Sequence, residues 1–325
     1  MSEQRPRVLY LSHVPNDMKA VILPLFCGFA DIAFLDRDDD RERMDRIGSA
    51  DVVVVAASKL TAPMIARAPS LRLVHHHGVG YHDTVDVDAL RRARLPLAIT
   101  RAGTTSVVAE HVVMLTLAVL RRLTLLDVSV RAGDWHVNAF RAQSRSLEGM
   151  TIGYLGMGEI GQATAKLFRP FGTTGIYYNR SGPLPAGATS ALGLTHAPLD
   201  DVISLADVLT LHLPLTAETH GLINATRLER MRPGSVLINT ARGKLVDSEA
   251  LADVLTRGHL AGAGLDVLDR EPPSLPSTLL QSPNLIVTPH VAAATLDALR
   301  QKTEFIAANI RRFWLSGRVE NAIAF

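Results

Sequence analysis

Residues Thr151–Gly161, with the sequence TIGYLGMGEIG, are the strongest indication of the fold of this chain. It begins with a strand-like apolar run and ends in a G-x-G-x-x-G pattern formed by Gly156, Gly158 and Gly161. In this pattern a side chain would block the tight turn, the approach of a pyrophosphate, or the contact between strand and helix. The helix that follows offers unpaired N–H groups and a partial positive charge to an anion at its N-terminus.

Glycine-rich turns are common, so the glycine pattern indicates a ligand site only together with the elements that surround it. A predicted amphipathic helix follows, closed by Pro170 and Gly172, and then a second strand at Gly175–Tyr178. Its predicted apolar face consists of Ile160, Leu167, Phe168 and Phe171. Strand, turn, helix and strand in this order favour dinucleotide binding over a purely structural turn.

Length and charge limit the classes of protein that fit. A chain of 325 residues is long for one core and suits two domains. Its formal net charge of +2 gives no electrostatic reason to expect a nucleic-acid partner. The apolar run Val112–Leu120 is too short to cross a bilayer, so no membrane partner is expected. Arg5 and Arg7 lead directly into a strand, without a signal-peptide pattern.

Cys27 is the only cysteine, which excludes intramolecular disulfides. A reducing, cytoplasmic setting fits this usage. Cys27 is expected to be a small buried apolar residue and not a reactive thiol.

Short apolar runs alternate with helical patterns along most of the chain, which predicts an α/β fold with parallel sheets. Before residue 100 the predicted strands are Val8–Leu11, Ile32–Leu35, Asp51–Ala56, Leu71–His75 and Leu97–Thr100, with helical patterns at Asp40–Ile47 and Val87–Arg94. From Thr151 onward they are Thr151–Leu155, Gly175–Tyr178, Val208–Leu211, Val236–Asn239, Ala261–Asp266 and Leu285–Thr288, with helices at Asn224–Met231, Asp247–Arg257 and Ala294–Leu315. Val107–Leu123, with Ser106 as N-cap, is predicted to be the helix that joins the two domains.

Polar residues follow four of the strands in the second half, where ligands of such sheets bind. Arg242 follows one strand, Glu271 another, and His290 ends the last; His212-Leu213-Pro214 follows a fourth and can press on a cofactor ring. Each has an ordinary explanation alone: a surface charge, a turn or a structural histidine. Together they suit reduction of a 2-oxo acid, which needs a two-pronged cation for the carboxylate and a proton donor with a pKa near neutrality. Glu271 would orient His290 and raise its pKa.

The order and spacing of these motifs resemble those of the D-2-hydroxyacid dehydrogenases. The likeness is carried by Gly156–Gly161, Asn239–Gly243, Asp266 with Glu271-Pro272, and Thr288–His290. It implies two Rossmann- or flavodoxin-like domains with the active site in the cleft between them. Residues 1–101 with 293–325 would form the substrate domain and 102–292 the nicotinamide domain, and the protein would be a homodimer.

The resemblance also implies a site. Arg242, Glu271 and His290 would be catalytic, and the loop Gly78-Val79-Gly80 would bind the substrate carboxylate with backbone N–H groups of Val79 and Gly80, beside Arg242 and His290. The expected cofactor-binding residues are Gly156, Gly158, Glu159, Ile160, Gly161, Asn179, Arg180, Ser181, His212, Leu213, Pro214, Thr219, Thr240, Ala241, Arg242, Asp266, His290 and Ala292.

The end of the second strand bears on the choice of cofactor. Asp is usual there and accepts bonds from the ribose hydroxyls of NAD, but this chain has Asn179, Arg180 and Ser181. Loss of the carboxylate removes repulsion of a 2′-phosphate, and the neighbouring cation and hydroxyl can bind one. NADP(H) is therefore favoured, with NAD(H) as the alternative if Arg180 is only a solvated charge.

The substrate side chain stays open. The loop 80–86 is one residue longer than the common family form, residues 100–103 depart from the usual Thr-Pro-Gly, and alanines replace glycines after His290. A small 2-oxo acid such as glyoxylate or hydroxypyruvate is expected, with phosphoglycerate or phosphite as alternatives; formate is disfavoured because its enzymes carry Gln where Glu271 stands. A dinucleotide-sensing, corepressor-like binding protein is the non-enzymatic alternative.

The triplet His75-His76-His77 is not expected to bind metal, because neighbours on a strand point to opposite faces. Trp135 is expected to serve in packing or in a dimer contact.

Overall fold

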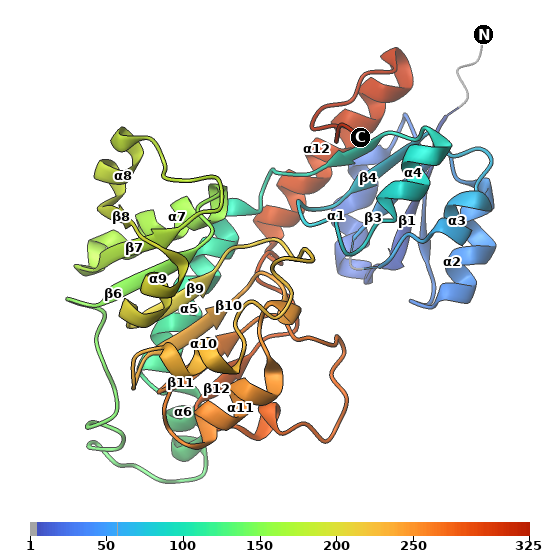
Figure 1. Ribbon diagram of the computed structural model, residues 1–325. Coiled ribbons are helices and arrows are strands. Elements are labelled where there is room, and N and C mark those ends of the chain that lie inside the picture. Colours follow the sequence, from blue (N-terminus) through green and yellow to red (C-terminus); the bar gives the residue numbers. More distant parts are fainter. Residues whose placement is uncertain (1–4, 57) are drawn as a thin grey trace. The chain divides into compact units, whose positions relative to one another are not determined.

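A computed structural model describes residues 5–56 and 58–325 of the chain (Figure 1). The chain divides into two compact units. One runs to Thr104 and resumes from Ala294 to Phe325, and the other comprises Thr105–Ala293. The first unit therefore takes its final helix from the far end of the chain.

The first unit is built on a five-stranded parallel sheet with the order β2-β1-β3-β4-β5. This order is that of flavodoxin-like folds. All four valines of β3 are buried, as expected for a central strand that is covered on both faces. The strands are β1 (Arg7–His13), β2 (Asp31–Leu35), β3 (Val52–Val55), β4 (Leu73–His76) and β5 (Leu97–Ile99).

Two helical layers cover this sheet. Ile22 and Phe26 of α1 and Ile306 and Ile310 of α12 belong to the cluster on one face. The other face carries α2, α3 and α4. The helices of this unit are α1 (Asn16–Phe26), α2 (Asp40–Arg46), α3 (Ala62–Ala66), α4 (Val87–Ala93) and α12 (Leu296–Ser316).

The second unit is built on a seven-stranded parallel sheet with the order β12-β11-β10-β9-β6-β7-β8. The order reverses between β6 and β9, and ligands of such sheets bind outside the carboxyl ends of the strands at this point. The strands are β6 (Thr151–Leu155), β7 (Thr174–Tyr178), β8 (Leu194–His196), β9 (Val208–Leu211), β10 (Val236–Asn239), β11 (Gly262–Leu265) and β12 (Leu285–Val287).

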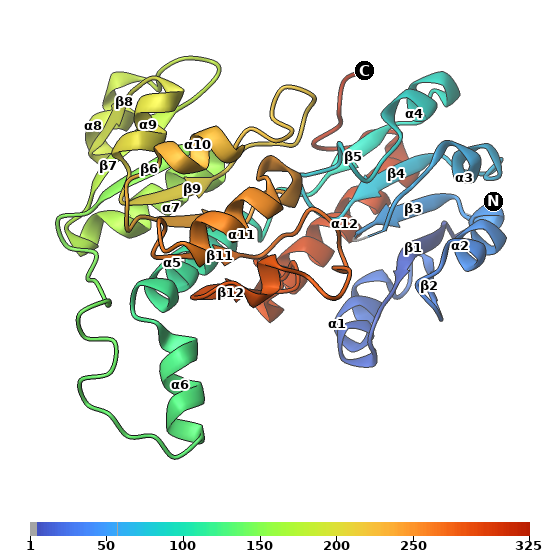
Figure 2. The same ribbon diagram turned by 60° about the horizontal axis from the view of Figure 1, so that its bottom comes forward.

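Helices cover both faces of this sheet too, as Figure 2 lets the reader follow. α5 (Thr105–Leu120) and α7 (Glu159–Phe168) pack on one face through Val112, Leu115 and Phe168. The opposite face carries α9, α10 and α11. The remaining helices are α6 (Leu123–Arg131), α8 (Ala186–Leu192), α9 (Leu199–Leu205), α10 (Ala225–Arg230) and α11 (Ser248–Thr256). The predicted α/β class with parallel sheets is confirmed.

An arm extends from the second unit. It consists of α6 and the segment 132–149, and both views show it reaching away from the sheet of its own unit (Figures 1 and 2). None of the nine residues of α6 is buried. Apolar side chains on this arm are exposed, including Val128, Trp135 and Val137.

Several local predictions were wrong. α5 begins at Thr105, so Ser106 is not its N-cap. Leu167 is exposed because it lies outside the buried face of α7, which Gly161, Thr164, Ala165 and Phe168 form. Phe171 is exposed in the 3₁₀ turn (Arg169–Phe171) that follows the helix. Cys27 is exposed and not buried, since it follows the last residue of α1. β8, a short strand at the edge of the sheet, was not predicted at all.

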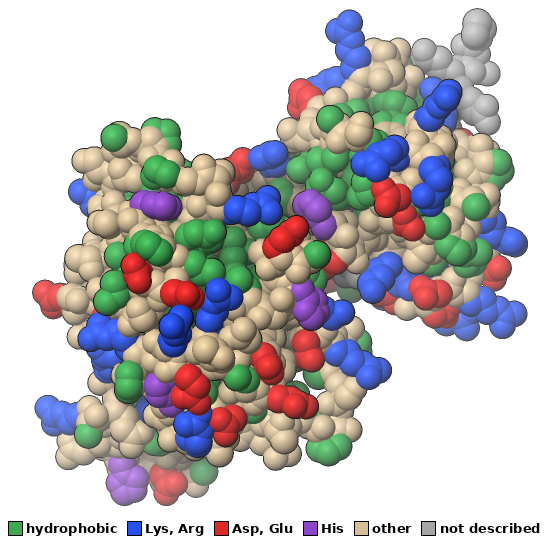
Figure 3. Space-filling model, in the orientation of Figure 1, with side chains coloured by type: hydrophobic (Ala, Val, Ile, Leu, Met, Phe, Trp, Pro, Cys, Tyr) green, Lys and Arg blue, Asp and Glu red, His purple; other side chains and the backbone are tan. Residues whose placement is uncertain are grey.

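Surface charge and helix hydropathy bear on binding to large partners. In the face that Figure 3 presents, basic and acidic side chains are interspersed. Among residues 5–56 and 58–325, no helix combines the length and the apolar character that crossing a membrane requires.

Candidate active site

The glycine turn after β6 gives each of its three glycines a different reason to lack a side chain. Gly156 has φ +94°, and a Cβ there would lie 2.5 Å from the carbonyl oxygen of His212. A Cβ on Gly161 would lie 2.4 Å from the carbonyl oxygen of Gly156. A Cβ on Gly158 would meet no described protein atom within 4 Å. The fold therefore requires the first and third glycines, whereas only a ligand gives a reason for the second.

The loop after β9 lies against this turn, since the sheet pairs β6 with β9. The His212 ring bonds to the Thr210 hydroxyl (Nε2–Oγ1 3.1 Å), and burial lowers the pKa of His212 to about 4. A neutral imidazole thus stands at this strand end at physiological pH. The Thr219 hydroxyl donates to the carbonyl of Pro214 and accepts the N–H of Thr216, so it fixes the shape of the loop.

The end of β7 carries the polar trio that bears on cofactor choice. The side-chain amide of Asn179 donates to the Ser181 hydroxyl (2.7 Å) and to the carbonyl of Gly182 (3.3 Å). Arg180 is exposed, and its charge contributes to lowering the pKa of Glu218, after the hydrogen bonds from Thr216 and from the Glu218 backbone.

The end of β10 forms a turn held by the buried side chain of Asn239. Its amide donates to the carbonyl of Arg242 (2.9 Å), and its oxygen accepts the N–H of Ala241 (3.0 Å). One nitrogen of the Arg242 guanidinium donates to the carbonyl of Ala241. The hydroxyl of Thr240 is buried and bonds to no described residue. A buried polar atom of this kind calls for a partner, and a ligand group could supply it.

The residue after Arg242 brings two strand ends together. A Cβ on Gly243 would lie 1.9 Å from the carbonyl carbon of Leu268, so the turn after β10 touches the backbone after β11. This backbone leads to Glu271, whose Oε1 accepts the N–H of Leu268 (3.0 Å). Glycine at position 243 thus allows the segments carrying Arg242 and Glu271 to meet.

Glu271 and His290 form an ion pair, with Oε2 2.8 Å from Nδ1. The hydrogen bond that His290 donates to Glu271 raises the pKa of His290 above its usual value, against the opposing effects of burial and of Arg242. Burial on its own raises the pKa of Glu271, but the bond and charge of His290 outweigh it and lower that pKa. About half of the His290 side chain is exposed (49%), and no described residue bonds to its Nε2. This nitrogen can therefore give a proton to a ligand.

Asp266, at the end of β11, lies beneath this pair. It is only 1% exposed, and its carboxylate accepts bonds from the Thr288 hydroxyl and from the N–H groups of Val291 and Ala292. The Asp266 oxygens thus accept hydrogen bonds from the segment that carries His290. Of the remaining predicted cofactor residues, Glu159 and Ile160 open α7, and Leu213 lies next to Gly156.

Val79 and Gly80 lie in the other unit, in the loop after β4. The ring of His76 is within hydrogen-bond distance of Gly78 and of the Thr84 hydroxyl, and the N–H of Thr100 donates to the carbonyl of Gly78. These bonds shape the loop that carries Val79 and Gly80. His75 instead contacts the Asn309 amide, and within residues 5–56 and 58–325 no three His, Cys, Asp or Glu side chains are grouped as a metal site.

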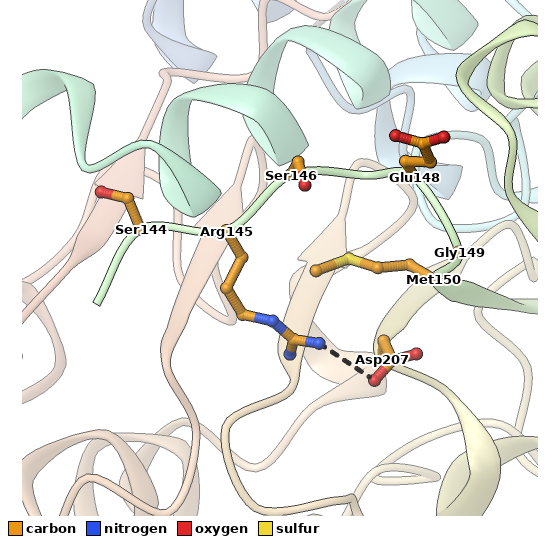
Figure 4. A pocket seen from close by; sticks show the side chains of 7 residues that line it. All are labelled: Ser144, Arg145, Ser146, Glu148, Gly149, Met150 and Asp207. Atoms are coloured by element: carbon orange, nitrogen blue, oxygen red, sulfur yellow. Dashed lines mark ion pairs between the residues drawn. The ribbon is translucent and has the colours of Figure 1, made fainter. Parts of the chain in front are cut away.

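The pocket drawn in Figure 4 lies elsewhere in the second unit. Its lining includes Met150, directly before β6, and Asp207, directly before β9, so it opens at the amino edge of the sheet. Asp207 pairs there with Arg145 and with Arg232 and accepts the N–H of Thr151. These bonds pair Arg145 and Asp207 of the pocket, whereas Arg242 and His290 follow strands at the opposite, carboxyl edge of this sheet.

Sequence reasoning missed three residues that shape the site: Asn239, Gly243 and His111. Asn239 and Gly243 stood within a recognised motif without a role. His111, on α5, approaches the Thr288 hydroxyl (Nε2–Oγ1 3.0 Å). The sequence signal that could have pointed to His111 was a histidine in the middle of a helix that is mostly apolar.

The site fits a dinucleotide on two observations of this structure. Gly158 leaves open space at the N-terminus of α7, and the first backbone N–H groups of a helix are the groups that bind a pyrophosphate in such folds. The Thr240 hydroxyl offers a buried bonding group without a partner among the described residues. Both lie at carboxyl ends of strands near the point where the strand order reverses.

Comparison with known proteins agrees with this geometry. Residues 113–292 match the family model described as D-isomer specific 2-hydroxyacid dehydrogenase, NAD binding domain. A glyoxylate reductase of Pyrococcus furiosus is 35% identical over 285 residues, which cover 86% of this chain and 84% of that protein. A D-3-phosphoglycerate dehydrogenase of Mycobacterium tuberculosis is 35% identical over 283 residues; these cover 86% of this chain but only 52% of that longer protein.

A solved structure is similar over nearly the whole chain. It is an NADPH-dependent glyoxylate/hydroxypyruvate reductase of Sinorhizobium meliloti, in complex with NADP and malonate. It is 31% identical in sequence, with a TM-score of 0.84, and the match covers 99% of this chain and 97% of that one.

Proposed function

The chain belongs to the D-isomer-specific 2-hydroxyacid dehydrogenases and is an NAD(P)-dependent oxidoreductase, and from this premise we propose that it reduces a small 2-oxo acid to the D-2-hydroxy acid. The observation that carries the proposal is the Glu271–His290 ion pair, which leaves Nε2 of a partly exposed, easily protonated imidazole without a described partner. The substrates favoured are glyoxylate and hydroxypyruvate.

His290 is the general acid of the proposed reaction. When bound, the nicotinamide ring supplies the hydride to the carbonyl carbon. His290 holds a proton on Nε2 and gives it to the carbonyl oxygen, where negative charge develops. Glu271 keeps the ring oriented through Nδ1 and stabilises its charged form. In the oxidative direction the neutral ring would accept the same proton.

Arg242 is the proposed carboxylate-binding residue. Its planar guanidinium can bond two oxygens of a 2-oxo acid at once, which a lysine cannot do. The bond to the carbonyl of Ala241 and the turn held by Asn239 limit the positions the guanidinium can take. We also propose, from the family resemblance, that N–H groups of Val79 and Gly80 bind the carboxylate.

The proposed cofactor preference is NADP(H). Asn179 replaces the carboxylate that would repel a 2′-phosphate, while Arg180 and the Ser181 hydroxyl are neighbouring groups that bind phosphate. The NADP complex of the Sinorhizobium reductase supports this preference by analogy. NAD(H) remains the alternative cofactor.

We expect Arg180→Ala to weaken binding of NADPH about 10-fold or more while changing NADH affinity by about twofold or less, since a charged hydrogen bond contributes about 1.5–3 kcal/mol. Fluorescence titration with each dinucleotide measures both dissociation constants. The matched control is Arg169→Ala, on the turn after α7, which should leave the ratio of the two constants unchanged. Equal weakening of NADPH and NADH by Arg180→Ala would contradict the preference.

The arm provides the basis for a proposed homodimer. Trp135 is 79% exposed and Val137 89%, and α6 buries none of its residues, so the arm exposes apolar surface that a second copy could cover. Light scattering of the purified protein tests the proposal. A molar mass about twice the 35.2 kDa of one chain is expected, and a monomer at micromolar concentration would contradict it.

Substrate assays test the proposed function. Oxidation of NADPH and of NADH is followed separately with glyoxylate, hydroxypyruvate, pyruvate and phenylpyruvate, and D-3-phosphoglycerate and phosphite are tested as hydride donors. Turnover of a 2-oxo acid is the expected result. Tight binding of NADPH without turnover of any of these compounds would instead favour a dinucleotide-sensing binding protein.

A further inference from the structure

His290 has a backbone conformation that residues with side chains rarely adopt. Its φ is +57°, in the left-handed region, where the Cβ crowds the neighbouring carbonyl. Such a conformation persists only where the surroundings hold it. The N–H of His290 donates to the backbone carbonyl of Asp266 (2.8 Å), which is the first of these restraints.

The Asp266 carboxylate supplies the other restraints. Its Oδ1 accepts the N–H of Val291 (2.9 Å), and its Oδ2 accepts the N–H of Ala292 (2.8 Å). Oδ1 also accepts the hydroxyl of Thr288 (2.5 Å). The buried Asp266 side chain therefore bonds to residues on both sides of His290 and restrains the backbone there.

Thr288 connects this carboxylate to α5. A hydroxyl has one hydrogen, and Thr288 gives it to Asp266 because a carboxylate only accepts. Toward His111 the hydroxyl oxygen must therefore be the acceptor, so His111 carries a hydrogen on Nε2. Burial lowers the pKa of His111, although Asp266 raises it, and a neutral ring protonated on Nε2 satisfies this requirement. The chain of donors runs in one direction, from His111 to Thr288 to Asp266.

We propose that His111 and Thr288 are positioning residues that hold the Asp266 carboxylate in place and thereby fix the backbone that presents the His290 imidazole to Glu271 and to the substrate. Neither residue touches the reacting atoms; both act through Asp266 and residues 288–292. The inference rests on the proposed function, because it concerns the residue that gives the proton. All of these groups lie within the second unit.

Two pairs of variants separate loss of the hydrogen bond from loss of packing. Thr288→Val removes the hydroxyl at nearly constant volume, and Thr288→Ser restores it. His111→Phe removes the donor, and His111→Gln keeps a side-chain N–H. The matched control is Thr116→Val, a buried threonine of the same helix as His111 whose hydroxyl bonds only to its own helix, at the carbonyl of Val112 (2.7 Å).

We expect Thr288→Val and His111→Phe to lower kcat about 10-fold to 100-fold with little change in KM or in the dissociation constant of NADPH, since a misplacement of about 1 Å can cost that much. Thr288→Ser and His111→Gln should recover most of the loss, and Thr116→Val should keep kcat within about twofold. Equal losses in Thr288→Val and Thr288→Ser, or wild-type kcat in Thr288→Val, would overturn the proposal.

A second measurement does not depend on turnover. NMR titration of the His290 ring, assigned with His290→Gln, gives its pKa in the wild type and in Thr288→Val. The charged groups acting on this ring are Glu271, Arg242 and Asp266. If residues 288–292 loosen, the contact with Glu271 weakens and the pKa of His290 falls in Thr288→Val but not in Thr288→Ser. An unchanged pKa in Thr288→Val overturns the inference even if the wild type reduces 2-oxo acids. Absence of turnover in the wild type, with the pKa shifted as expected, counts against the proposed function alone.

Discussion

Replacement of His290 by glutamine is expected to lower kcat for reduction of a 2-oxo acid by ~10²–10⁴, the range that general acid–base catalysis contributes. Glutamine keeps a hydrogen-bonding group of similar reach but cannot release a proton at neutral pH. The exposed Nε2 of His290 is the donor of the proposed mechanism, and Glu271 is bound to the other nitrogen. Steady-state kinetics with the best substrate of the assay panel measures the loss.

The dissociation constant of NADPH should change by about threefold or less in this variant, because the glycine turn and the end of β7 are untouched. His196→Gln, at an exposed position at the end of β8, is the matched control and should retain wild-type kcat. A His290→Gln enzyme with kcat within about twofold of the wild type would remove His290 from the chemistry.

Replacement of Arg242 by lysine is expected to lower kcat/KM for a 2-oxo acid by about 10-fold to 100-fold, as loss of one charge-assisted hydrogen bond contributes about 1.5–3 kcal/mol. The positive charge is kept, so the effect isolates the planar, two-pronged geometry of the guanidinium. Competition by the inert dicarboxylate malonate gives a second measure, and its inhibition constant should rise along with KM.

Arg145→Lys serves as the matched control for this change. Arg145 also pairs with an acid but lies at the amino edge of the same sheet, on Asp207 (Figure 4). Its replacement should leave kcat/KM unchanged. If Arg242→Lys keeps the wild-type kcat/KM and malonate affinity, Arg242 does not bind the carboxylate through two oxygens.

The sequence predicted the sheet of the second unit well because its central strands β6, β9, β10 and β11 are buried and appear as short, continuous apolar runs. β9 and β10 were predicted with the bounds that the structure has, and Asn224 and Asp247, the first residues of two predicted helices, are the N-caps of α10 and α11. β8 was missed because a three-residue edge strand, with two exposed residues, leaves almost no apolar pattern.

The residues of the candidate site also fall into those that the sequence predicted and those that it did not. A strand end is readable from the sequence, so Arg242, Glu271 and His290 could be assigned to one edge of a parallel sheet. The contact of Gly243 with the backbone of Leu268, in contrast, depends on how two strand ends approach, which no local pattern encodes. The bond from His111 to Thr288 spans 177 residues of the sequence, and periodicity along a helix says nothing about such a partner.

The pH dependence of the ion pair follows from the directions of the two pKa shifts. The pKa of His290 is raised above 6.5, so its stabilising pairing with Glu271 is fully present below that value and is lost as pH rises through the raised pKa. The pKa of Glu271 is lowered, so its contribution is lost only in acid, as pH falls through the lowered pKa. Between the lowered pKa of Glu271 and the raised pKa of His290, the imidazole is charged and can donate a proton.

Proton donation by His290 is tested by the pH profile of kcat/KM for reduction, recorded for the wild type and for Glu271→Gln. The wild type should lose activity as pH rises through a pKa above 6.5, since neutral His290 has no proton to give. In Glu271→Gln the fall should begin at lower pH, because the group that raises the pKa of His290 is gone. A profile that is flat in the wild type, or a fall at the same pH in both proteins, would contradict proton donation by a histidine that Glu271 keeps charged.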